Sequence, residues 1–168
     1  MSLEARVAAL ENLVASFNRG SFSYIDLVSK EREREWTPTL TAATPGDISV
    51  TYSTRVGRYT RIGGMVWLYF NIETSAFSHT TASGDVQITG LPFTAKTDTG
   101  VTHLGAMVIS GWNPSTSYTE VTCKIDNATS VLKFLQGADN TAIAEMQIGD
   151  LPTGGTPLLA ADIFYRVA

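Results

Sequence analysis

From Trp36 to the end of the chain, apolar and polar side chains alternate with a period of two residues. The alternation is clearest in residues 48–52, 120–125 and 159–167, and turn signals rich in Gly, Asn, Asp and Pro separate such runs. A period of two places successive side chains on opposite faces of a strand. Many short strands joined by regular turns predict an antiparallel β-sandwich or barrel.

Residues 65–70 depart from this alternation because they are apolar without interruption. One face of an antiparallel sheet usually meets water, so a strand with two apolar faces needs a second cover. The N-terminal segment or other copies of the chain could supply this cover, and we favour other copies. We expect the two faces of the strand to carry Val66, Leu68 and Phe70 on one side and Met65, Trp67 and Tyr69 on the other.

Residues 1–20 have the heptad spacing of a short coiled-coil helix. Val at a and Leu at d suit a small parallel bundle, and we predict a parallel homotrimer. About two heptads are marginal alone, so this prediction requires a second contact between copies. The alternative is an amphipathic helix docked on its own domain. The residues expected along the trimer axis are Leu3, Val7, Leu10, Val14 and Phe17.

Residues 21–35 form a charged connector between this helix and the β domain. From Lys30 to Glu35 the charge changes sign at every step. Such a run is typical of a solvated stalk, and the alternative is ion pairing between copies. The predicted organisation is therefore a helix in 1–20, a connector in 21–35 and a β domain in 36–168.

The composition excludes several classes of protein. Hydrophobic residues make up 43% of the 168 and the net charge is only -4, so the chain is not disordered, and its acidic balance argues against a nucleic-acid partner. The single cysteine, Cys123, excludes a disulfide framework and a multi-cysteine metal site. No apolar run is long enough to insert in a membrane, and charges near the N-terminus interrupt any signal-peptide core. We therefore expect a protein that is either intracellular or released by a route other than a cleaved signal.

Residues with catalytic or metal-binding chemistry are scattered. His79 and His103 are far apart and have no metal-ligand spacing. Cys123 falls on the apolar side of its predicted strand, which favours a core residue over a nucleophile. No phosphate-binding loop, nucleophile elbow or zinc-protease motif is present, and no acidic pair suggests glycoside hydrolysis. We therefore predict no catalytic residue, no metal and no cofactor.

Loop 111–118 has the composition of a sugar-binding site. Aromatic faces stack on the C–H surfaces of sugars, while amides and hydroxyls form hydrogen bonds with sugar hydroxyls. The alternative is that Trp112 closes the end of the β domain as a core residue. The candidate glycan-binding residues are Trp112, Asn113, Ser115 and Tyr118.

Two further segments have binding potential. Residues 77–85 form a polar, turn-rich loop. Arg55, Arg58 and Arg61 add positive charge near the first predicted hairpin. They could meet an anionic polysaccharide, but we favour a solvated or inter-subunit role.

Several short motifs are shared with one family. They are WTPTL at 36–40, Tyr52-Ser53, GRYTRIG at 57–63, the apolar strand 65–70, ITGLPF at 88–93 and ADIFYRV at 161–167. Residues 36–168 thereby resemble the C-terminal β domain of bacteriophage tail fibres and tailspikes. The resemblance implies a trimer, a jelly-roll-like sandwich, a place on the virion and binding to the host surface, often to glycans. The chain is short for this family, with no room for a large virion-anchoring domain or a β-helix that cleaves polysaccharide.

These features predict a trimeric phage fibre protein that binds a host-surface polysaccharide or receptor through its C-terminal β domain. Its expected partners are two further copies of itself, other virion proteins at the N-terminal region, and the host surface. One alternative is a purely structural virion protein, such as a head fibre, a decoration protein or a trimerising cap. A polysaccharide-degrading enzyme is the third interpretation and has only scattered carboxylates in its favour.

Overall fold

The computed structural model describes residues 4, 6–8, 11, 33–114 and 118–167. The chain divides into two units, residues 1–32 and 33–168. In the first unit the described residues are helical, and Val7 is exposed. The other predicted trimer-axis residues, Leu3, Leu10, Val14 and Phe17, lie outside the described residues, so the coiled coil stays a prediction.

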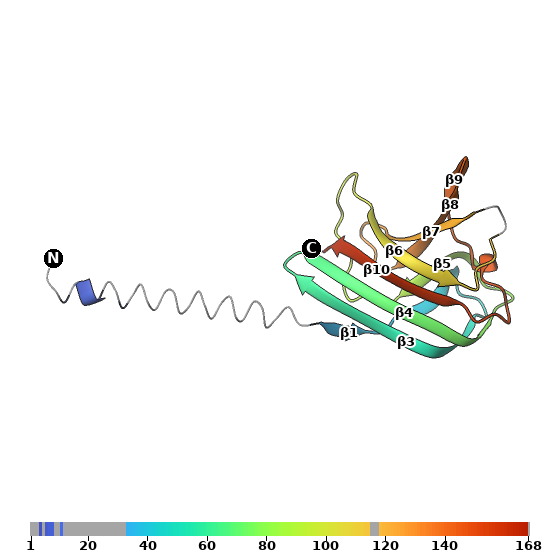
Figure 1. The fold of residues 1–168 in the computed structure, drawn as a ribbon, viewed down its shortest axis with the longest axis horizontal. Coiled ribbons are helices and arrows are strands. Elements are labelled where there is room, and N and C mark those ends of the chain that lie inside the picture. The colour runs from blue at the N-terminus through green and yellow to red at the C-terminus, as the bar shows by residue number, and fades with distance from the viewer. Residues whose placement is uncertain (1–3, 5, 9–10, 12–32, 115–117, 168) are drawn as a thin grey trace. The chain divides into compact units, whose positions relative to one another are not determined.

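The described residues of the second unit form ten strands and one short 3₁₀ helix (Figure 1). The strands are β1 (Arg34–Trp36), β2 (Thr39–Thr44), β3 (Ser49–Ile62), β4 (Met65–Ser78), β5 (Ser83–Thr89), β6 (His103–Ser110), β7 (Glu120–Ile125), β8 (Leu132–Ala138), β9 (Thr141–Glu145) and β10 (Leu158–Arg166), and the helix is η1 (Ile148–Asp150). The prediction of a mainly β, antiparallel domain is confirmed. Its first strand begins inside the segment that we assigned to the connector.

All ten strands belong to one antiparallel sheet that curls into a half-barrel. The strand order is β1-β3-β4-β10-β6-β7-β8-β5-β2, and β9 pairs with β8 alongside this path. Figure 1 shows the β8–β9 hairpin standing out from the curled sheet. The longest pairing joins β3 to β4, which run from the Ile62–Met65 pair to the Ser49–Ser78 pair.

The hydrophobic core fills the concave side of the sheet. In residues 65–70 of β4 the buried side chains are those of Val66, Leu68 and Phe70, and Met65 and Trp67 on the other face are exposed. The neighbouring strand β10 alternates in the same way, with Leu159, Ala161, Ile163 and Tyr165 inside. Strand 65–70 therefore has one face in the core and a second, largely apolar face in solvent.

The two end strands of the sheet, β1 and β2, are separated by only two residues in the chain. Side-chain contacts between β2 and β3, the neighbour of β1, therefore join the two ends of the sheet. Arg55 Nε on β3 donates to the Pro38 carbonyl oxygen at 2.6 Å, and its guanidinium lies 4.5 Å from the centre of the Tyr52 ring. The Leu40 amide on β2 donates to the Tyr52 hydroxyl at 3.1 Å. We call this contact between β2 and β3 the seam.

In the part of the chain that the structure describes, none of the helical segments has the length and apolar character needed to cross a membrane.

Candidate functional site

The predicted sugar-binding loop begins with a tryptophan that points inward. Trp112 is half-buried and packs against the hydrophobic core. Its indole N–H donates to Gln136 Oε1 on β8 at 3.3 Å. An indole that already has an internal partner and a core contact fits our alternative, in which Trp112 closes the end of the β unit.

A series of buried hydrogen bonds fixes the position of this part of the loop. Gln136 Nε2 donates to Asp150 Oδ2 at 3.1 Å, and both side chains are buried. Asp150 Oδ2 also accepts the Gln147 amide at 2.9 Å, and the Asp150 carbonyl accepts the Asn113 amide at 2.7 Å. Buried polar groups that are satisfied in this way hold a loop in a single arrangement.

The structure separates the four predicted glycan-binding residues into different environments. Asn113 is exposed, Tyr118 is half-buried and Trp112 is engaged with Gln136. Ser115 lies outside the described residues. Of the predicted set, Asn113 therefore presents the most open side chain.

An open hollow of about 390 Å³ lies beside the end of this loop, between β7, β8 and β9. Glu120 and Thr122 of β7, Leu135 of β8 and Ile143 of β9 contribute to its lining. The Thr119 amide donates to the Gly137 carbonyl oxygen at 2.9 Å, so the loop ends at the rim of the hollow. Its lining combines a carboxylate and a hydroxyl with two aliphatic side chains, and its volume lies within the range of small-molecule sites.

Sequence reasoning missed this hollow. The alternation of β8 does indicate that Leu135 and Gly137 share the outward face. The tertiary structure alone shows that β9 folds back against β8 and places Ile143 beside Gly137. The only available sequence signal was the Gly137–Asn140 turn between the two strands.

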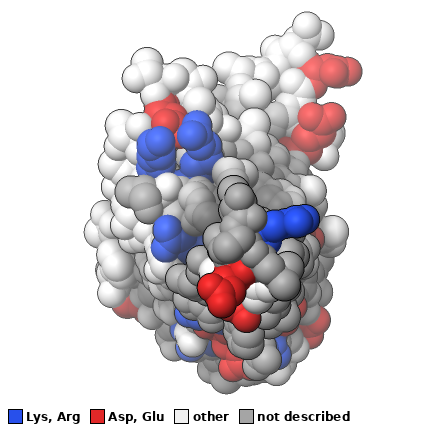
Figure 2. All heavy atoms as spheres, turned by 90° about the vertical axis from the view of Figure 1, so that its left-hand side faces the viewer, with Lys and Arg blue, Asp and Glu red and all other residues white. Residues whose placement is uncertain are grey.

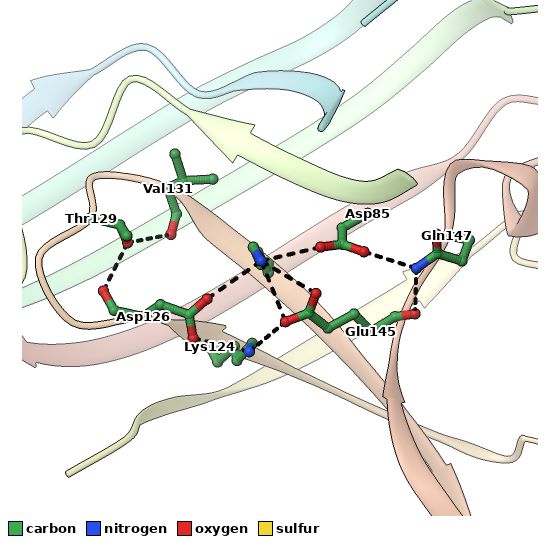
Figure 3. A network of polar contacts seen from close by, with 8 residues as sticks. Asp85, Lys124, Asp126, Thr129, Val131, Glu145 and Gln147 are labelled. Carbon is green, nitrogen blue, oxygen red and sulfur yellow. Dashed lines mark hydrogen bonds and ion pairs between the residues drawn. The ribbon is translucent and has the colours of Figure 1, made fainter. Parts of the chain in front are cut away.

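A network of charged side chains lies on the same outward face as the hollow, further along β7 and β8 (Figure 3). Lys133 Nζ lies 3.1 Å from Asp85 Oδ2 and 3.3 Å from Glu145 Oε2. Lys124 Nζ lies 2.6 Å from Glu145 Oε1 and 3.0 Å from Asp126 Oδ1. The network joins strands β5, β7, β8 and β9.

Hydrogen bonding and ion pairing lower the pKa of one acid of this network. Hydrogen bonding with the Glu145 side chain is the largest cause, and contacts with Gln147 and Lys133 add to it. Together they lower the pKa of Asp85 to about 2, although desolvation opposes the shift. Asp85 is therefore held in its charged form, as an ion-pairing group rather than a proton donor.

Loop 77–85 is attached to the turn before β3. Asp47 accepts hydrogen bonds from the Thr80 amide at 2.8 Å and the Thr81 amide at 2.7 Å, and also from both hydroxyls. These bonds, with that from the Thr80 hydroxyl the strongest, hold the pKa of Asp47 well below its usual range. His79 Nε2 lies 2.9 Å from the Leu151 carbonyl oxygen. The loop's polar groups thus serve as internal ties.

The other groups singled out in the sequence have structural surroundings. Cys123 is fully buried, and desolvation raises the pKa of its thiol to about 12. His103 is buried with its ring against that of Tyr165. The core position predicted for Cys123 is confirmed.

The three arginines near the first hairpin make contacts within the chain. Arg55 belongs to the seam, and Arg58 Nη1 lies 2.6 Å from Glu35 Oε1. Arg61 lies over the Phe93 ring, 4.8 Å from its centre. Figure 2 views one end of the molecule and shows basic side chains interspersed with acidic ones.

The described residues contain no group of three or more His, Cys, Asp or Glu side chains that could hold a metal ion. Comparisons with protein-family models, with curated proteins and with solved structures found no match to the chain. The proposal below therefore depends on the residues themselves.

Proposed function

We propose that the protein is a trimeric phage fibre protein of the virion, made in the host cytoplasm, that binds a host-surface glycan through its β unit. The N-terminal unit would form the coiled coil and dock on other virion proteins, and the β unit would adopt a jelly-roll-like sandwich arrangement within the trimer. The two-unit organisation of the chain and the family resemblance of residues 36–168 support this proposal.

The observation that carries the glycan proposal is the position of the hollow at the end of loop 111–118. Glu120 and Thr122 offer oxygen atoms to sugar hydroxyls, and Leu135 and Ile143 offer aliphatic contact to the C–H face of a sugar ring. Asn113 presents an exposed amide on the same loop. A shallow site of this kind binds one sugar with a Kd of about 1 mM, and three copies gain avidity on a repeating polymer.

The experiment measures binding of the full-length protein to an array of purified bacterial surface polysaccharides. We expect the parent to bind at least one polymer, and we expect Asn113→Ala on the loop and Glu120→Ala in the hollow to weaken that binding about tenfold or more through loss of avidity. Thr99→Ala, at an exposed turn residue outside the loop, is the matched control and should bind like the parent. Circular dichroism checks that each variant is folded.

Two results would contradict the proposal. If Asn113→Ala and Glu120→Ala fold and bind like the parent, the glycan site is neither at loop 111–118 nor in the hollow beside it. If the parent binds no polysaccharide but antibody labelling finds it on virions, the purely structural virion protein is the correct alternative. The inward contact of Trp112 with Gln136 is the observation that favours that alternative.

A further inference from the structure

Exposed apolar side chains gather on the convex side of the sheet, opposite the core. We call this surface the apolar face. Its side chains are 38% to 67% exposed, whereas their sequence neighbours Val66, Ile163 and Tyr165 are buried. The apolar face consists of Ile62 on β3, Met65 and Trp67 on β4, Leu104 and Val108 on β6, and Phe164 on β10.

Strand register makes most of this surface continuous. Ile62 lies opposite Met65, and Trp67 lies opposite Phe164 with the two rings stacked at 6.3 Å between centres. Gly105 lies opposite Ile163, which brings the preceding residue, Leu104, beside Phe164. The apolar face therefore crosses four neighbouring strands in the order β3-β4-β10-β6.

The apolar face is as large as the largest apolar patches that monomers usually leave in water. At about 150–250 Å² for a large apolar side chain, the exposed fractions leave on the order of 600 Å² of apolar surface. The largest apolar patch of a typical monomer is about 300–600 Å². A stable protein interface buries about 800 Å² on each partner, so this face supplies most of one partner's share.

Charges of both signs flank the apolar side chains on the same side of the sheet. Arg58 lies opposite Tyr69, which in turn lies opposite Asp162, so one row across three strands carries a cation, an aromatic ring and an anion. Asp162 is exposed and forms no ion pair with another described residue. Arg58 is paired with Glu35 of its own chain, so the open charge of this row is that of Asp162, which a basic side chain of a second copy can meet.

We propose that the apolar face is buried against another copy of this chain. A single helix is about 10 Å wide, whereas four strands span about 14 Å between the outer strand axes, so the N-terminal helix of the same chain would cover only part of the face. The face is made of regular rows of side chains on neighbouring strands, which suits packing against a second sheet surface rather than a small ligand. This inference rests on the homotrimer of the proposed function and identifies its contact surface in the β unit.

The test uses thiol labelling of the full-length chain. Cys123 is buried with a thiol pKa raised to about 12, so a newly introduced cysteine is the reactive one. Val108→Cys places a thiol on the apolar face, and Ile143→Cys places one at a matched position on β9, since the two side chains are 67% and 72% exposed. Maleimide labelling rates are measured over a range of protein concentrations, alongside sedimentation velocity.

Where the parent is oligomeric, Val108→Cys should be labelled at least about tenfold more slowly than Ile143→Cys, because its thiol lies within the interface. Phe164→Asp should weaken the oligomer at least about tenfold while the circular dichroism spectrum is unchanged, because a charge would be buried at the interface. Phe164→Asp also tests the interface if the parent oligomer does not dissociate on dilution.

The outcomes separate this inference from the function on which it rests. If the parent is oligomeric but both cysteines label at the same rate and Phe164→Asp assembles normally, the apolar face is not the interface, and the homotrimer stands. If Val108→Cys is protected in a monomer, the chain's own N-terminal segment covers the face, and the inference is wrong. If the parent is monomeric at every concentration and both thiols react equally, the homotrimer of the proposed function falls as well.

Discussion

At Gly105 two strands and a buried thiol come so close together that no side chain fits. A Cβ atom at this position would lie 2.4 Å from the Asp162 carbonyl oxygen and 2.8 Å from Cys123 Sγ. Real Cβ atoms essentially never approach backbone atoms so closely. The pairing of β6 with both β10 and β7 therefore depends on the absence of a side chain here.

Gly105→Ala should lower the free energy of unfolding by about 1–3 kcal/mol, because the methyl group must displace backbone and core atoms. Urea unfolding followed by circular dichroism measures this change. Gly137→Ala is the matched control, since the nearest atom to its new Cβ would be Ile143 Cγ1 at 3.7 Å. The control should change stability by less than about 1 kcal/mol, in the stabilising direction. Equal stability of both variants with the parent would show that β6 has room to move.

At the level of the strands, periodicity predicted the elements better than it predicted their connections. The alternating run 120–125 coincides with β7, the run 159–167 lies in β10 except for its last residue, and the apolar run 65–70 begins β4. Alternation is a local property, since it reports only which face of a strand is dry. The seam has no such signal, because Tyr52 and Arg55 act on residues 12 to 17 positions earlier in the chain.

Tyr52→Phe should lower the free energy of unfolding by about 1–2 kcal/mol, because the amide of the buried residue Leu40 loses its hydrogen-bond acceptor. Amide hydrogen exchange at Leu40 should accelerate more than exchange in β4, since the seam opens locally. Tyr59→Phe is the control on the same strand, because the Tyr59 ring contacts Phe93 and its hydroxyl forms no hydrogen bond with another described residue. Unchanged exchange at Leu40 in Tyr52→Phe would mean that the seam does not hold β2 to β3.

Across the whole β unit, charged contacts connect segments that are distant in the sequence. The network of Figure 3 joins Asp85 on β5 to Lys133 on β8 and Glu145 on β9. Asp47 joins the turn before β3 to loop 77–85. Both Asp85 and Asp47 have a pKa lowered in the folded state. Their contribution to stability is therefore complete above the unfolded pKa and is lost as the pH falls through the folded pKa.

We expect the Asp85 contribution to disappear between about pH 4 and about pH 2, the interval between its unfolded and folded pKa values. Asp85→Asn should destabilise the protein by about 1–2 kcal/mol at pH 7, a value reduced by the partial exposure of the network. That difference from the parent should shrink as the pH falls from 4 to 2. Urea unfolding over this pH range measures it, with Asp139→Asn, at an exposed residue of the β8–β9 turn, as the control. A difference that stays constant down to pH 2 would contradict a lowered pKa at Asp85.

The sequence by itself determined the mainly β, antiparallel class, the positions of its clearest strands, the core position of Cys123 and the two apolar faces of residues 65–70. The spacing of neighbouring residues indicates each of these features, because side chains alternate between the two faces of a strand. The sequence also carries the heptads of residues 1–20, whose role in a homotrimer stays a prediction.

Only the tertiary structure decided how the strands are ordered and what their side chains meet. It placed β10, the last strand, between β4 and β6, and it joined all strands into one curled sheet. It turned Trp112 toward Gln136, and it created the hollow by folding β9 beside β8. It also assembled the apolar face from four strands that are up to about 100 residues apart in the chain. Periodicity does not predict which strands pair, because strand order is set by packing among distant segments rather than by any local pattern.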